Sequence, residues 1–182
     1  MISSRSSTLL MAAALSLTVA VAPAVAQQGG ASLNDAQIAH IAVTADAVDV
    51  EVGRLAEQRA ENAEVKDFAA MMVRDHSAVN VRAAALAKKL GVTPEPNATS
   101  KSLMAGAKEV EGKLQQLQGA AFDRAYMDRE VGYHQAVLNV LDQQLIPSTQ
   151  NGELKALLTQ VRPVIAAHLE RAKAIRASLG GM

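Results

Sequence analysis

Apolar residues recur every three or four positions through nearly the whole chain after residue 33, which is the period of one helix face. Strand-like alternation is missing, and the helix-forming residues Ala, Leu, Gln, Glu, Lys and Arg are abundant. Between residues 34 and 60 the apolar positions are spaced 3, 4, 3, 4 and 3: Ile38, Ile41, Ala45, Val48, Val52 and Leu55. The sequence therefore predicts an all-α protein whose amphipathic helices bury their apolar faces against one another.

Capping and helix-breaking residues divide this pattern into segments. We expect helices at about 34–60, 63–90, 102–117, 120–145 and 152–179. Asn34 and Asn62 are typical N-cap residues, Gly91 is a typical helix end, and Pro147 is expected to close the fourth segment. Short connections make the first two and the last two helices antiparallel neighbours. The predicted fold is an antiparallel four-helix bundle with an extra short helix before the third long helix, in one domain over residues 34–179.

The first 26 residues have the pattern of a secretory signal peptide. Arg5 supplies the positive charge, residues 9–22 form an uncharged apolar run too short to span a membrane, and Ala24-Val25-Ala26 matches a cleavage site. We expect cleavage after Ala26, a flexible leader at 27–33, and a periplasmic protein. An uncleaved membrane anchor is the alternative, which Pro23 disfavours. The absence of cysteine argues against a lipoprotein.

Composition excludes several classes of function for the expected mature chain of 182 − 26 = 156 residues. Its formal charge is 17 − 18 = −1 once Arg5 is removed, and it has no basic stripe, which argues against nucleic-acid binding. It has no second long apolar run, so no transmembrane segment is expected. The lack of cysteine excludes cysteine-ligated iron–sulfur clusters, covalent haem attachment and thiol catalysis.

Polar residues interrupt the apolar stripes at a few positions. His76, His134 and His168 each continue the apolar stripe of their own segment. Asp49 lies on the interior side of the first helix, and Glu130 shares a face with His134, four residues later. Buried imidazole and carboxylate groups are costly unless they are paired or coordinated. These five residues are therefore the candidate site.

Residue counts from the turns predict the heights of these side chains along the helices. At about 1.5 Å per residue, Asp49 and His76 lie at nearly the same height, and so do Glu130 and His168. The same count, taken from a turn near residue 148, places His134 about two helical turns from His168. It predicts two polar clusters, one in each helix pair, and leaves open whether they merge.

Two interpretations of the interior polar residues compete. In the first, Asp49, His76, Glu130, His134 and His168 bind a transition metal, since imidazole with carboxylate suits zinc, copper or iron. In the second, they are core hydrogen-bonding groups of a non-enzymatic structural or envelope-stress module, with an envelope protein or a second copy as partner. The sequence favours a non-enzyme with no identifiable small-molecule substrate, because it lacks G-x-S-x-G, a Gly-rich phosphate loop and H-E-x-x-H.

Four segments together resemble one protein family. They are Val48–Ala56, Phe68–His76, Gly119–Met127 followed by His134, and Pro163 with His168-Leu169. This pattern is similar to the exported bacterial family called domain of unknown function 4142, itself similar to ferritin-like four-helix bundles, over nearly all of residues 34–178. The resemblance implies that fold and places His76, His134 and His168 at signature positions. It implies no reaction.

The chain departs from a ferritin-like di-iron pattern. Such a centre uses Glu-x-x-His on two helices. The residues three positions before the histidines are instead Val73, Val131 and Ile165, all apolar. A mononuclear zinc or copper site is therefore the more natural metal hypothesis.

Overall fold

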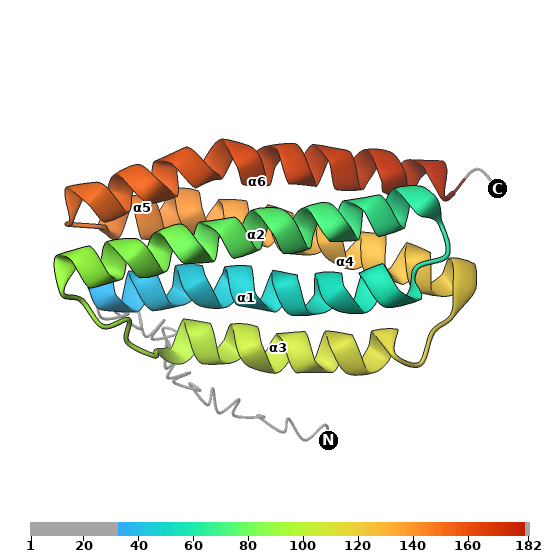
Figure 1. Cartoon of the computed structure of the whole chain (residues 1–182), viewed down its shortest axis with the longest axis horizontal. Coiled ribbons are helices and arrows are strands. Elements are labelled where there is room, and N and C mark those ends of the chain that lie inside the picture. Colours follow the sequence, from blue (N-terminus) through green and yellow to red (C-terminus); the bar gives the residue numbers. More distant parts are fainter. Residues whose placement is uncertain (1–32, 181–182) are drawn as a thin grey trace, which may run out of the picture. The chain divides into compact units, whose positions relative to one another are not determined.

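The computed structural model describes residues 33–180, which are helical apart from short connections (Figure 1). The elements are α1 (Asp35–Arg59), α2 (Ala63–Leu90), α3 (Ala98–Leu114), α4 (Gly119–Val140), the π-helical η1 (Leu141–Leu145), α5 (Ile146–Ser148) and α6 (Gly152–Ser178). Residues 33–180 contain no strand, which confirms the all-α class. The predicted signal peptide at 1–26, and the leader as far as residue 32, lie outside the described residues.

Capping side chains explain where the helices begin and end. The Asn34 side chain accepts a hydrogen bond from the Gln37 amide at 2.8 Å, and the Asn34 amide in turn donates to Gln37 Oε1 at 3.2 Å, forming a capping box. The Asn62 side chain accepts hydrogen bonds from the first turn of α2. At the other end of α2, Gly91 adopts the left-handed conformation at φ 64°. The predicted bounds of these two helices agree with the structure to within one residue.

Two predicted helices had wrong bounds, and the first of them also ends earlier than expected, at Leu114 and not at Leu117. The helix expected at 102–117 is α3, which begins earlier because Asn97 and Ser100 form a capping box that the sequence analysis overlooked. The helix expected to end at Leu145 continues through η1 and α5 to Ser148. Pro147 lies in the first turn of α5, where its fixed φ and missing N–H are tolerated.

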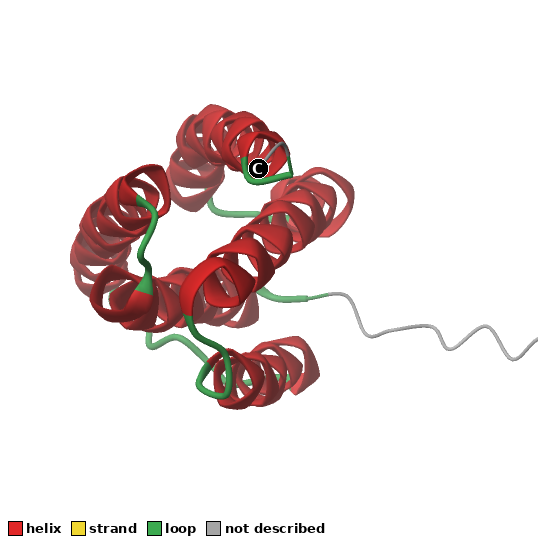
Figure 2. Cartoon of the chain, turned by 90° about the vertical axis from the view of Figure 1, so that its right-hand side faces the viewer, coloured by secondary structure: helices red, strands yellow, loops and turns green. Residues whose placement is uncertain are grey.

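The helices form two hairpins with one further helix alongside. α1 packs extensively on α2, and α4 on α6, whereas the two hairpins contact each other less. α3 connects the hairpins along the chain and packs mainly on α1 (Figure 1). Seen along their length, the helices lie side by side with the connections at their ends (Figure 2). The predicted likeness to ferritin-like bundles stays a prediction.

A polar layer separates two apolar clusters in the interior. One cluster is built around Phe68, Met72, Phe122 and Tyr126, and the other around aliphatic residues such as Ile41 and Leu158. The sequence-predicted polar residues lie between these two clusters along the helices. Within residues 33–180, no helix is both long enough and apolar enough to cross a membrane.

Candidate metal centre

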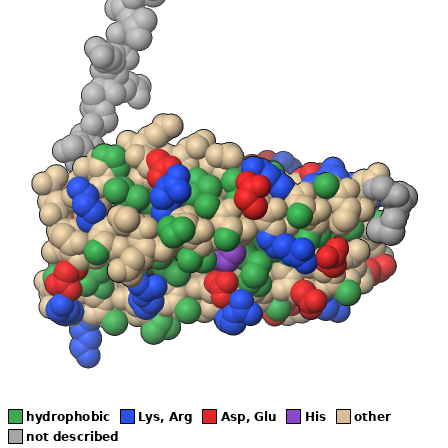
Figure 3. Space-filling view, turned by 90° about the horizontal axis from the view of Figure 1, so that it is seen from above, with side chains coloured by type: hydrophobic (Ala, Val, Ile, Leu, Met, Phe, Trp, Pro, Cys, Tyr) green, Lys and Arg blue, Asp and Glu red, His purple; other side chains and the backbone are tan. Residues whose placement is uncertain are grey.

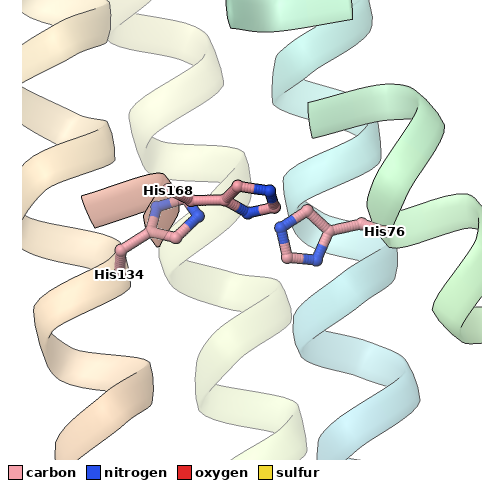
Figure 4. Close-up of side chains that lie close together, drawn as sticks. All are labelled: His76, His134 and His168. Atoms are coloured by element: carbon pink, nitrogen blue, oxygen red, sulfur yellow. The ribbon is translucent and has the colours of Figure 1, made fainter. Parts of the chain in front are cut away.

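Three histidines from three helices meet in the polar layer. His76 comes from α2, His134 from α4 and His168 from α6, and none is more than 5% exposed. Their ring centroids lie 5.3 Å apart for His76 and His168, 5.5 Å for His134 and His168, and 5.8 Å for His76 and His134. Figure 4 shows the three rings gathered in one place. The three histidine predictions therefore converge on one site.

Each imidazole is held by one ring nitrogen. His76 Nδ1 lies 2.6 Å from Asp46 Oδ1, and His168 Nε2 lies 3.1 Å from Asp75 Oδ2. His134 Nδ1 lies 2.9 Å from the backbone carbonyl oxygen of Glu130. The other nitrogens, His76 Nε2, His134 Nε2 and His168 Nδ1, are buried without a hydrogen-bond partner. An imidazole that donates through one nitrogen can offer the lone pair of the other to a metal ion, which is the usual arrangement of metal-binding histidines.

Two buried carboxylates add oxygen donors. Asp49 is fully buried, and its Oδ2 lies 3.0 Å from His76 Nε2, without hydrogen-bonding geometry, and 3.8 Å from His134 Nε2. Glu130 Oε2 lies 3.3 Å from His134 Nδ1. Neither oxygen has a hydrogen-bond partner. One potential donor atom from each of Asp49, Glu130 and His134 falls within 4.8 Å of the others, and the same holds for His76, His134 and His168.

The two predicted polar clusters are one site, because His134 belongs to both groups of donor atoms. The prediction that His134 lies two helical turns from His168 was wrong. The connection between α5 and α6 is centred on Gln150, and not on residue 148. From Gln150, His134 is 150 − 134 = 16 residues away and His168 is 168 − 150 = 18, so the two lie at similar heights.

Arg129 organises the two carboxylates, although the sequence analysis did not identify it. Its side chain is 9% exposed, and its Nη1 contacts both Asp49 Oδ1 and, at 2.6 Å, Glu130 Oε1. The guanidinium carbon lies 4.0 Å from the centre of the Tyr133 ring, whose hydroxyl donates to the Ala45 carbonyl oxygen at 2.7 Å. Each carboxylate thus contacts Arg129 through one oxygen and a histidine through the other.

The surroundings of the site shift the pKa values of two of its histidines in opposite directions. Burial opposes the charge of His76, but Asp46 and Asp49 outweigh it and raise the pKa of His76 to about 10. Burial, together with the charge of His76, lowers the pKa of His168 to about 4. Despite burial, Arg129 and His76 hold the pKa of Asp49 well below its usual range. The metal-free site therefore keeps a negative charge on Asp49, a positive charge on His76 and a neutral His168 at pH 7. A metal ion would bind His76 Nε2 with release of the proton that this nitrogen carries.

Sequence reasoning missed Asp46 and Asp75 as well as Arg129. Asp46 could have been found, since it lies three residues before Asp49 and hence on the same side of α1. Asp75 follows the apolar stripe less closely, and only the packing of α6 beside α2 brings it to His168. Asp123, which precedes Glu130 by seven residues, has a structural task, because its carboxylate accepts hydrogen bonds from the amides of Glu61 and Asn62.

The three histidines of the centre are almost fully buried. Figure 3 shows one face of the molecule, on which a histidine side chain is visible among hydrophobic side chains, with acidic and basic groups nearby. Asp75, which holds His168, has 28% of its side chain exposed.

Comparison with known proteins gives one match. A family model described as "Domain of unknown function (DUF4142)" matches residues 20–175. No curated protein and no solved structure matches the chain.

Proposed function

The chain belongs to the DUF4142 family, whose description assigns no activity, and on this premise we propose that it is an exported protein that binds one transition-metal ion. The ligands are His76, His134, His168 and Asp49, with Glu130 beside them. The observation that carries the proposal is the convergence of three buried imidazole nitrogens, none of which has a hydrogen-bond partner, from three different helices.

The unpaired atoms favour a metal site over a purely structural polar layer. A structural role would satisfy the buried groups with one another, because each unsatisfied buried group costs about 1–3 kcal/mol. Here His76 Nε2, His134 Nε2, His168 Nδ1, Asp49 Oδ2 and Glu130 Oε2 have no hydrogen-bond partner. A metal ion bound among them would supply the missing interaction to several of these atoms at once.

The donor set indicates the kind of metal. Three imidazole nitrogens with one carboxylate oxygen, and no thiolate, suit zinc or copper, and also iron. Arg129 neutralises part of the carboxylate charge, so the site is suited to a single divalent ion. Bound there, such an ion could be stored, transferred or used as a Lewis acid.

Export is supported by the sequence pattern of residues 1–26, with its charged start, apolar run and Ala24-Val25-Ala26. A metal-binding protein exported in this way would meet its ion in the periplasm. N-terminal sequencing of the protein from the periplasmic fraction should give Gln27 as the first residue. A protein that still begins at Met1 would contradict cleavage of the signal peptide.

A metal titration followed by thermal unfolding tests the proposed site. Zinc or copper added to metal-free protein should raise the melting temperature, because binding to the folded state alone stabilises it. The His76/His134/His168 triple-alanine variant should show no such rise, while His40→Ala, which removes the remaining histidine, should behave like the native chain. No stabilisation by zinc, copper or iron would leave the histidines as structural groups.

A further inference from the structure

A second feature of the structure lies beside the candidate metal centre and is not explained by it. A cavity of about 680 Å³ extends between the first half of α1, the second half of α2, and the segments η1 and α6. Its volume falls within the usual range of ligand pockets, about 300–1,000 Å³. The cavity is partly open to solvent, since the exposed Ala84 belongs to its lining, so a ligand can enter it from outside.

The lining of the cavity is almost entirely aliphatic. Representative residues are Ala42, Val79, Ala83, Leu86, Val140 and Leu158. The alanines create the space, because they leave room where larger side chains would meet across the bundle. An aliphatic lining offers water few hydrogen-bond partners, so a hydrocarbon is the better occupant.

The cavity is elongated along the helices. Its lining extends along α1 from Asp35 to Ala47, 12 residues or about 18 Å. Along α6 it extends from Asn151 to Ile165, 14 residues or about 21 Å. A long hydrocarbon chain fits this shape better than a compact ring system does.

Charges in the lining select against an anionic ligand. No Lys, Arg or His is among the lining residues, and both carboxylates already have partners. Asp35 accepts hydrogen bonds from the amides of Gln150 and Asn151, and Asp46 contacts His76. A carboxylate or phosphate headgroup would thus enter the cavity without a cation to pair with, and beside negative charge.

One polar atom at the inner end of the cavity lacks a partner. Asn80 Oδ1 is buried and accepts no hydrogen bond. Asn80 lies one turn after His76 on α2, at the end of the cavity nearest the metal centre. A hydroxyl group on the ligand would satisfy this oxygen.

We propose that the cavity binds a neutral lipid-like molecule with one long hydrocarbon chain and a hydroxyl group that donates to Asn80 Oδ1. The aliphatic lining takes the chain and sets the class of ligand. Asn80 and the lack of basic residues set the headgroup. This binding does not depend on whether the histidines hold a metal.

Displacement of a fluorescent apolar probe, N-phenyl-1-naphthylamine, from the purified mature protein tests the proposal. Tetradecan-1-ol should displace the probe, and tetradecanoate should do so at least about tenfold more weakly, because its charge would be buried unpaired. Ala83→Phe fills the cavity and should abolish displacement. Ala85→Phe, the same change at an exposed position of α2 that does not line the cavity, should leave it intact.

Several outcomes would overturn the proposal. One is the absence of probe binding by the native chain. A native chain whose dimer interface covers the cavity would give this result as well. A second is equal displacement of the probe by tetradecan-1-ol and tetradecanoate. A third is a folded Ala83→Phe variant that binds the probe as well as the native chain does. Should Ala83→Phe fail to fold, Ala42→Leu on α1 makes a smaller change to the same cavity and should weaken displacement. If tetradecan-1-ol displaced the probe from Ala42→Leu as well as from the native chain, that result would equally contradict the proposal.

Discussion

Arg129 is the residue on which the geometry of the centre depends most. A single guanidinium fixes one oxygen each of Asp49 and Glu130 and turns the other toward the histidines. It also neutralises part of the charge of these carboxylates, which fits the proposal of a single bound ion.

Replacing Arg129 should destabilise the metal-free protein strongly. Arg129→Gln leaves two buried carboxylates without their cation, and breaking a buried ion pair typically costs about 3–5 kcal/mol. Arg176→Gln removes the more exposed contact with Asp128 and should cost only about 0–1 kcal/mol. Urea unfolding of both variants measures the two costs. Equal small losses would mean that Arg129 does not hold the carboxylates in place.

Asp75 should control metal affinity without touching the metal. Its carboxylate orients His168 through Nε2, and loss of such a partner typically lowers metal affinity about 10–100-fold. Asp75→Ala should show this loss in a chelator-competition assay with zinc. Asp67→Ala, at an exposed position of the same helix, is the matched control. An unchanged affinity in Asp75→Ala would show that His168 is oriented by packing alone.

At the scale of the elements, local signals made most of the fold predictable. The helices around Asn34, Asn62 and Gly91 could be predicted closely because their caps are strong and lie next to long amphipathic stripes. The extension through Pro147 could not, because it depends on the π-helical turn before it. The site was predictable as a set of interior residues. Its convergence was not, since it depends on how the two hairpins pack.

Asn97 is the cap that the sequence analysis overlooked, and it also ties α3 to α1. Its Oδ1 accepts a hydrogen bond from the Ser100 amide, and its Nδ2 donates to the Gln37 carbonyl oxygen, both at 3.1 Å. Asn97→Ala should destabilise the protein by about 1–2 kcal/mol. Asn97→Asp keeps the cap but loses the donor to α1, and should cost less. Chemical unfolding of the two variants separates these effects. An Asn97→Ala variant as stable as the native chain would contradict the capping role of Asn97.

At the scale of the whole molecule, the two shifted histidines should shape how stability depends on pH in the metal-free state. The raised pKa of His76 stabilises the fold fully below pH 6.5, and this contribution is lost as the pH rises toward about 10. The lowered pKa of His168 acts in the opposite direction, since the unfolded chain takes up its proton between pH 6.5 and about 4. The free energy of unfolding should therefore peak near pH 6.5.

A series of urea-unfolding measurements from pH 4 to pH 10 checks this profile. The decline on the alkaline side should flatten in His76→Gln, because that variant no longer releases a proton there. An alkaline decline that survives in His76→Gln would assign it to other groups.

The most direct test of the central claim is the metal content of untagged protein purified from the periplasm. The account predicts close to one zinc, copper or iron ion per chain, and none in a folded His76/His134/His168 triple-alanine variant purified in the same way. A native protein without metal, or equal metal in both proteins, would contradict the assignment of these histidines as metal ligands.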